Sequence, residues 1–289
     1  MCHLRDTCLR DAGFYDPYAA LKADENAKAL DLLPGVLEEL DAVAEPLARL
    51  HAAIRGVFAG NVFDLGAPKL VEKYEAGMSA GEMFRDARRD LRGRPWAVDK
   101  LDALSERFAA VRPPHARAVV FCDNAGSDVV LGMVPFMREL LRRGTEVVAA
   151  ANSVPSINDV TVPEMRGIME RAAEVDGAVL RDAWREGRWR LVSSGNDAPV
   201  IDLRRVSEAV AEEARGADLV VLEGMGRGIE TNLYAKFTVE SLKLAMIKHE
   251  EVATCLGGRM YDCVCQYLPA SAPVEAVGQE GVHAAAAAV

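Results

Sequence analysis

Long apolar runs are absent from this chain of 289 residues. No stretch reaches the roughly 20 consecutive apolar residues that a membrane-spanning helix needs. The opening residues, MCHLRDTCLRDAGFYD, mix charged and apolar side chains and lack the apolar core of a signal peptide. These absences exclude a membrane partner, and we expect the protein to be cytoplasmic.

Basic side chains are in deficit, because 34 Lys and Arg residues stand against 44 Asp and Glu residues and give a formal net charge of −10. No sizeable basic patch is visible along the sequence. An acidic surface repels the phosphate backbones of DNA and RNA, so nucleic acid is excluded as a partner. The oligomeric state stays open, a homo-oligomer included.

Cysteine is uncommon, and its six positions do not have the spacing of a zinc site. We expect the thiols to stay reduced, because a large chain without an export signal folds in a reducing compartment. Cys263 and Cys265 alternate within a strand-like run and are expected to pack in the core. Cys122 is expected to be a small buried residue of a strand.

The first part of the chain has a helical pattern. Between residues 19 and 58, apolar side chains recur every three or four positions, and the Pro34-Gly35 pair predicts a break. The helical pattern ends at Arg112-Pro113-Pro114. The sequence therefore predicts an N-terminal helical subdomain over residues 1–114.

From residue 115 the pattern changes to apolar strands that alternate with amphipathic helices. Near-continuous apolar strands of this kind indicate a mostly parallel sheet with helices on both faces. The sequence therefore predicts a Rossmann-like α/β core over residues 115–269, and the Ala-rich tail 270–289 is expected to be disordered. The predicted strands cover residues 116–122, 145–151, 189–194, 217–223, 242–248 and 260–268.

Polar residues follow the predicted strands at the end where open α/β sheets bind ligands. Their carboxylate and amide oxygens suit a hard divalent ion, and backbone N–H groups of Gly-rich turns and a lysine suit phosphate. The sequence therefore predicts a divalent ion next to a phosphate. The polar residues are Asp123, Asn124, Asn152, Ser153, Asn158, Asp159, Ser193 to Asp197, Glu223 to Arg227, and Lys248.

Simpler interpretations exist for each position taken alone, because a single Asp or Asn after a strand usually forms a turn or caps a helix. Asp128 is interpreted in this way, as a first-turn acid of the following helix. Recurrence of polar residues at the same end of successive strands favours a functional site.

Two other site types can be tested directly. A haloacid-dehalogenase phosphatase needs a second Asp two places after Asp123, and Ala125 stands there, so this class is excluded. A dinucleotide fingerprint matches at Gly224 and Gly226, but Ile229 occupies its third glycine position. A nucleotide-dependent oxidoreductase therefore stays as a weak alternative.

Several long motifs resemble the damage-control phosphatase family, which is also called ARMT-like. They are AGNVFDLGA at 59–67, DNAGSDVVLGMVPFMRELLRRGTEVVAAANSVPSINDVT at 123–161, ADLVVLEGMGRGIETN at 217–232 and ESLKLAMIK at 240–248. The resemblance covers about residues 2–269. It implies a metal-dependent phosphatase with a helical part packed on a Rossmann-like core.

The resemblance also implies roles for residues of this chain. Asp123, Asn124 and Asp159 would hold one divalent ion, such as Mg, Mn, Co or Ni. Asp123 and Asp159, with Lys248, would be catalytic, and either water attacks directly or Asp123 first takes the phosphoryl group. The family motif often has Ser at position 125, and Ala125 removes a hydroxyl but no ion ligand. Substrate would contact Asn152, Ser153, Asn158, Glu223, Gly224, Met225, Gly226, Arg227 and Asn232.

The chain most resembles the branch of the family whose phosphatase domain is fused to a vertebrate pantothenate kinase homologue. The substrate implied for this branch is a small phosphorylated metabolite, 4′-phosphopantetheine or its oxidised or sulfonated forms. Sugar phosphates, used by other branches, remain an alternative. A second alternative is a protein of this fold that binds metabolites without catalysis. A methyltransferase is not supported, because the sequence shows no convincing methyl-donor site. Asn61 and Asp64 make the 59–67 segment polar, so it either lines the pocket or forms a helix-terminating turn.

Overall fold

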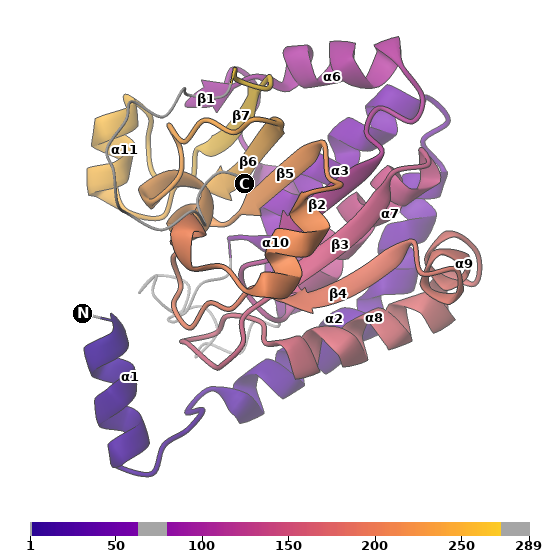
Figure 1. Ribbon diagram of the computed structural model, residues 1–289. Coiled ribbons are helices and arrows are strands. Elements are labelled where there is room, and N and C mark those ends of the chain that lie inside the picture. The colour runs from indigo at the N-terminus through magenta and orange to yellow at the C-terminus, as the bar shows by residue number, and fades with distance from the viewer. Residues whose placement is uncertain (1, 63–79, 273–289) are drawn as a thin grey trace.

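A seven-stranded sheet with helices on both faces forms the centre of the protein, in a computed structural model that describes residues 2–62 and 80–272 (Figure 1). The strand order is β1-β7-β6-β5-β2-β3-β4, and only the β6–β7 pair is antiparallel among these neighbours. This confirms the predicted α/β class with a mostly parallel sheet. The strands are β1 (Val98–Asp99), β2 (Arg117–Phe121), β3 (Glu146–Ala151), β4 (Trp189–Ser193), β5 (Leu219–Glu223), β6 (Glu240–Met246) and β7 (Cys263–Leu268).

The order of the central strands creates a switch point between β2 and β5. From β2 the chain moves outward through β3 to β4, and it then returns to the other side of β2 to build β5 and β6. Loops at the carboxyl ends of β2 and β5 therefore diverge to opposite faces of the sheet. A crevice at such a point is where doubly wound sheets bind ligands.

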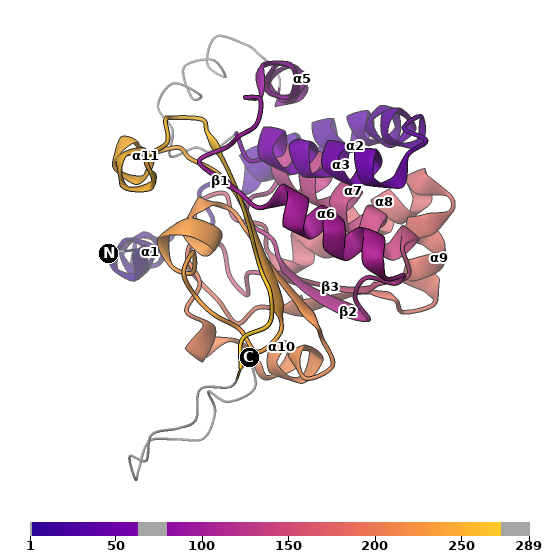
Figure 2. The ribbon, with the colours of Figure 1, turned by 90° about the horizontal axis from the view of Figure 1, so that it is seen from above.

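Two hydrophobic layers lie on the two faces of the sheet. Ala118 and Val120 of β2 face one layer, and Val119 and Phe121 face the other, as the alternation of a strand requires. Figure 2 shows most helices on one side of the sheet and α10 on the other side. The helices are α1 (Cys2–Asp11), α2 (Ala19–Asp41), α3 (Pro46–Gly60), α5 (Ala80–Asp90), α6 (Leu101–Ala110), α7 (Val134–Arg142), α8 (Val162–Asp176), α9 (Val179–Arg185), α10 (Glu208–Ala214) and α11 (Glu250–Leu256).

Helix α2 corrects one prediction, because it continues through Pro34 to Asp41 without the break expected there. Proline removes one backbone hydrogen bond from a helix. Leu33, Leu37 and Leu40 are buried on the same face around that point, so burial of this face outweighs the local cost. The break lies instead between α2 and α3.

The N-terminal helices and the sheet share one core. Leu33 of α2 and Ile54 of α3 belong to the same buried cluster as Val120 of β2, and β1 pairs with β7 at Val98 and Val264. The division into 1–114 and 115–269 stays a prediction. The predicted tail falls mostly outside the described residues. Among the described helices, none combines the length and the apolar composition needed to cross a bilayer.

Replacing Leu33 with Ala should destabilise the whole described fold, because this side chain is fully buried in the shared core. We expect the free energy of unfolding to fall by about 2–5 kcal/mol. Denaturant unfolding followed by circular dichroism and by tryptophan fluorescence should give one coincident transition. Val111→Ala, at an exposed position, is the control and should change stability by less than about 0.5 kcal/mol. Two separate transitions would contradict a shared core.

Candidate active site at the switch point

The strands β2 and β5 bring two acids together at the switch point. Asp123 follows β2, and Glu223 is the last residue of β5. The backbone N–H of Asp123 donates to Glu223 Oε2 at 2.9 Å. A short π-helix follows each strand, η1 (Asp128–Met133) and η3 (Met225–Glu230), and such segments are frequent at functional sites.

An acidic cluster of Asp123, Asp128 and Glu223 forms the centre of this region. One carboxylate oxygen from each lies within 4.8 Å of the others, and all three side chains are buried. Asp128 lies in the first turn of η1, as expected, but its carboxylate points into the cluster. The interpretation of Asp128 as a residue of the following helix alone is therefore wrong.

Two asparagines hold the acidic cluster together. Asn61, at the end of α3, donates from Nδ2 to Asp128 Oδ2 and to Glu223 Oε1, both at 2.9 Å. Its Oδ1 accepts from the backbone N–H of Met246 at 3.2 Å. Asn124 Nδ2 donates to Asp123 and Asp128, each at 2.9 Å. These amides spread the carboxylate charge but do not neutralise it.

Two carboxyl groups of the cluster, those of Asp128 and Glu223, bind protons more tightly than exposed acids. Burial, reinforced by the charge of Asp123, raises the pKa of Asp128 to about 6, although Lys248 opposes the change. Burial and the charges of Asp128 and Asp123 also raise the pKa of Glu223 well above its usual value. Perturbed acids of this kind are typical of functional sites.

Arg227 joins the cluster to the loop after β3. Its guanidinium is fully buried, bonds to Asp123 Oδ1 through Nη1, and donates through Nη2 to Asp159 Oδ2 at 2.6 Å and to Asn152 Oδ1 at 2.9 Å. The backbones of Asn124 and Asp159 also pair as an isolated bridge. Asp123 and Asp159 thus face one shared cation.

A polar surface of α2 closes the site from the N-terminal side. Lys22 is buried, pairs with Asp16 and Glu164 at 2.9 Å each, and reaches the backbone oxygen of Asp159 at 3.5 Å. Asn26 Oδ1 accepts from the backbone N–H of Gly126 at 2.6 Å. This helix therefore supports both loops that carry acidic residues.

Gly224 allows the two strand ends to approach. Its φ is +93°, and a Cβ at this position would overlap the Asp123 carboxylate. In the neighbouring loop, Ile157 has a φ of +48°, which is unusual for a β-branched residue and marks local strain just before Asp159.

Most residues expected at the site lie there, but several have other contacts. Lys248 is buried, and its charge acts on Asp128. The N–H groups of Asn152 and Ser153 already donate to Val160 and Asn196. Asn232 Nδ2 donates to backbone oxygens of Ile201 and Arg227, so it stabilises the end of η3. The remaining expected residues, Asn158, Met225 and Gly226, lie in the loop after β3 and in η3.

Some site residues were not predicted. The buried face of α2 is apolar from Ala29 onward, and Lys22, Glu25 and Asn26 extend the same face toward the N-terminus. Polar residues at the positions of a buried helix face are the sequence signal that could have indicated a site there. For the segment of Asn61 the sequence predicts either a pocket wall or a helix-terminating turn. Asn61 is both the C-terminal cap of α3 and a donor to the cluster. Asp64, from the same segment, lies outside the described residues.

The acidic cluster fits a divalent cation chemically. Its donors are carboxylate oxygens, which are hard ligands that Mg²⁺ and Mn²⁺ prefer. Asp128 Oδ1 is buried and has no hydrogen-bond partner among the described residues. A buried acceptor of this kind needs a proton or a cation.

Comparison with known proteins identifies the family. The model described as "Damage-control phosphatase ARMT1-like domain" matches residues 1–264. The chain belongs to this family. The match confirms the family expected from the motifs, and with it the phosphatase class. It extends over the N-terminal helices as well as the sheet.

Relatives in this family include plant and animal proteins. A damage-control phosphatase of Arabidopsis thaliana is 46% identical over 92% of this chain and 71% of its own length. A 4′-phosphopantetheine phosphatase of Mus musculus is 36% identical over 91% of this chain. An Arabidopsis protein named pantothenate kinase 2 is 44% identical over 94% of this chain. The chain spans only 37% of the mouse protein and 32% of the kinase.

A solved structure supports the architecture. A DUF89-family protein from Pyrococcus horikoshii superposes with a TM-score of 0.65 over 91% of this chain and 79% of its own, at 19% identity. At this identity the likeness concerns the fold alone, and it agrees with the parallel sheet described above.

The raised pKa values predict how stability depends on pH when divalent ions are removed. Native Asp128 binds a proton more tightly than it does in the unfolded chain, so its contribution to stability is present below about pH 4 and is lost as pH rises through about 6. Urea unfolding in EDTA between pH 4 and 7 should show this loss.

The control for this measurement is a pair of variants. Asp128→Asn should flatten the pH dependence, and Asp31→Asn, at an exposed position of α2, should leave it unchanged. An equally steep profile in Asp128→Asn would contradict the proton uptake assigned to the cluster.

Proposed function

We propose that this protein is a divalent-metal-dependent phosphatase that hydrolyses small phosphate monoesters. The observation that carries the proposal is the charge balance at the switch point. At the strand ends, four buried carboxylates, Asp123, Asp128, Asp159 and Glu223, stand against two buried cations, Arg227 and Lys248. The buried Lys22 and Glu25 of α2 carry opposite charges and leave this difference unchanged. Full ionisation leaves two negative charges in excess, and buried excess charge is costly. Two protons or one divalent cation would balance it.

We assign the ion ligands to Asp123, Asn124 and Asp159. Arg227 already contacts both carboxylates, so their oxygens converge on a position where a cation is stable. The Asn124–Asp159 backbone bridge keeps the amide of Asn124 beside the same position. Asp128 and Glu223, which accept hydrogen bonds from Asn61, would not bind the ion and would instead fix the position of Asp123.

The bound ion would supply Lewis acidity to the phosphate and lower the pKa of a water molecule. Residues of the chain would bind the phosphate and hold the ion ligands in position. Arg227 and Lys248 lie close enough to the acids to bind phosphate oxygens and to stabilise the negative charge that develops on them. Asn61 and Asn124 would keep the carboxylates in place, and Gly224 would leave room for the Asp123 carboxylate beside β5.

The proposed substrate class is 4′-phosphopantetheine and its oxidised or damaged forms. Support comes from the mouse relative, which is named a 4′-phosphopantetheine phosphatase and aligns with 91% of this chain. The Arabidopsis damage-control phosphatase, at 46% identity, supports a role in removing damaged metabolites. Phosphate release from a panel of metabolites, fructose 1-phosphate included, tests both the class and the substrate.

Metal removal provides the first test. Purified protein should release phosphate from 4′-phosphopantetheine when Mg²⁺, Mn²⁺, Co²⁺ or Ni²⁺ is present and should lose most of this activity in EDTA, because the ion supplies charge stabilisation worth several kcal/mol. Adding back the ion should restore the rate. Full activity in EDTA would overturn the metal dependence.

The ligand assignment is tested by three matched Asp→Asn variants. Asp123→Asn and Asp159→Asn should abolish Mn²⁺ binding in calorimetry and lower kcat by at least about 10³-fold. Asp128→Asn should weaken Mn²⁺ binding by about 10–100-fold without abolishing it, as expected for a residue that orients a ligand. If Asp128→Asn abolishes binding and Asp159→Asn does not, the acidic cluster itself is the ligand set.

A glycine pair tests the close approach of Gly224 to Asp123. Gly224→Ala should displace the Asp123 carboxylate and strongly lower kcat, because the added methyl group overlaps it. Gly35→Ala is the matched control, since nothing lies within 4 Å of its added Cβ. This control should keep full activity and gain about 0.5–1 kcal/mol of stability as a helix interior residue. Normal turnover by Gly224→Ala would contradict the described approach.

A further inference from the structure

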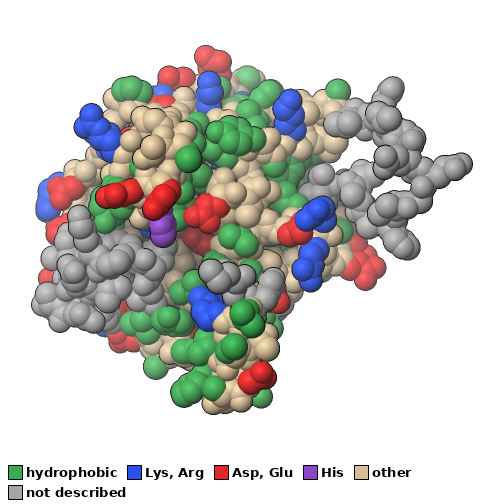
Figure 3. All heavy atoms as spheres, turned by 90° about the vertical axis from the view of Figure 1, so that its left-hand side faces the viewer, with side chains coloured by type: hydrophobic (Ala, Val, Ile, Leu, Met, Phe, Trp, Pro, Cys, Tyr) green, Lys and Arg blue, Asp and Glu red, His purple; other side chains and the backbone are tan. Residues whose placement is uncertain are grey.

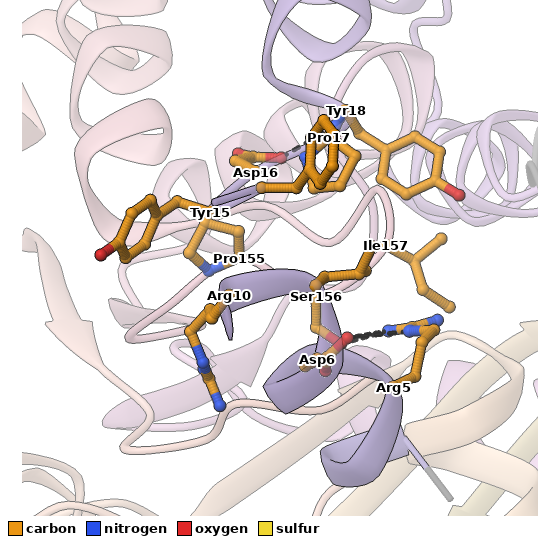
Figure 4. Close-up of a pocket in the computed structure, with 12 residues that line it drawn as sticks. Arg5, Asp6, Arg10, Tyr15, Asp16, Pro17, Tyr18, Pro155, Ser156 and Ile157 are labelled. Atoms are coloured by element: carbon orange, nitrogen blue, oxygen red, sulfur yellow. Dashed lines mark hydrogen bonds and ion pairs between the residues drawn. The ribbon is translucent and has the colours of Figure 1, made fainter. Parts of the chain in front are cut away.

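A cavity of about 260 Å³ lies between α1, the segment after it, and the loop before Asn158 (Figure 4). Figure 4 shows α1 with Arg5 and Asp6 on one side and the segment Tyr15 to Tyr18 on the other. The loop residues Pro155 to Ile157 form the third wall. The segment CLRDAGFYDPY at 8–18, which the catalytic proposal leaves unused, supplies most of the residues of these walls.

Residues in two walls of this cavity are linked to Asp159 of the proposed active site. Ile157 lines the cavity and is two residues from Asp159, so their Cα atoms are at most about 8 Å apart. Asp16 lines it from the opposite side and pairs with Lys22 at 2.9 Å, which reaches the Asp159 backbone oxygen. If the phosphate of a ligand lies beside Asp159, the rest of that ligand can therefore reach this cavity.

The cavity does not have the chemistry of a second phosphate site. Arg5 is paired with Asp6 at 2.6 Å, and Asp6 also accepts from the hydroxyl of Ser156 at 3.3 Å. Asp16 is paired with Lys22, and the remaining charged wall residue, Arg10, is exposed. The paired charges leave fixed polar atoms that suit amide or hydroxyl groups of an uncharged ligand.

Aromatic and aliphatic surfaces make up much of the remaining wall. Phe14 and Tyr15 are 60% and 76% exposed, and they lie beside Leu9, Pro17 and Pro155. Figure 3 shows hydrophobic side chains on the projection at the bottom of that view, where α1 lies. Neighbouring exposed apolar groups of this kind mark binding sites. A volume slightly below the usual range for small-molecule pockets suits part of a ligand, such as a flexible arm.

We propose that this cavity binds the uncharged arm of an elongated phosphate monoester, an arm built of aliphatic and amide groups, while the phosphate occupies the site at Asp123 and Asp159. The inference rests on the proposed phosphatase function and deepens it. The cavity then favours an amide-containing arm over a compact polyhydroxylated sugar. Phe14 and Tyr15 are the specificity residues, and they act on substrate binding without contacting the phosphate.

Paired substrates test this assignment. In Phe14→Ala and Tyr15→Ala, kcat/KM for 4′-phosphopantetheine should fall about 10-fold or more through KM, because an apolar contact with the arm is lost. The kcat/KM for fructose 1-phosphate should change less than about twofold in the same variants. Tyr234→Ala, an exposed tyrosine outside the cavity wall, is the matched control and should change neither. Equal losses for both substrates, or no loss for either, would overturn the proposal.

Binding of pantetheine, which lacks the phosphate, separates this proposal from the proposed function. Calorimetry with up to about 10 mM pantetheine should detect binding to the unmodified protein and to Asp123→Asn, and weaker binding to Phe14→Ala. Phosphate release without pantetheine binding would overturn the cavity assignment and leave the phosphatase intact. Pantetheine binding without phosphate release from any ester would support the cavity and overturn the phosphatase.

Discussion

Buried negative charge at the carboxyl ends of β2 and β5 is the constraint on which the rest of the site depends. Asp123, Asp128 and Glu223 are close enough to repel one another, and a low-dielectric interior makes that repulsion costly. The donors of Asn61 and Asn124 and the charge of Arg227 offset this repulsion, and the raised pKa values of Asp128 and Glu223 favour their uncharged forms. A divalent cation bound there, as proposed, would replace protons on these buried acids.

The topology explains why the charge gathers at this place. In a doubly wound sheet the loops after the two central strands separate, and the polar groups at their ends meet in the crevice between them. The N-terminal helices then complete the crevice, since α3 contributes Asn61 and α2 contributes Lys22 and Asn26. They share a hydrophobic core with the sheet, which accounts for a family match that covers them too.

Much of the sheet and part of the site could be predicted from the sequence, and the physical reason is local. Apolar β-branched runs such as the one before Asp123 predict buried strands, and the strand-end rule then selects Asp123, Glu223 and Lys248. Contacts between segments that are far apart in the sequence leave no comparable local pattern. The approach of Asn61 to Asp128, and that of α1 to the Ile157 loop, depend on packing. Pro34 shows the same limit, because burial of α2 overrides a residue that breaks helices elsewhere.

Proton release on ion binding tests the central claim most directly. Mn²⁺ should be titrated into the metal-free protein near pH 6 in buffers of different ionisation enthalpy, so that the heat reports the number of protons released. If a divalent cation replaces protons on the buried acids, binding should release at least part of a proton, and Asp128→Asn should release less. Tight binding with no buffer dependence, or no binding at all, would contradict the account.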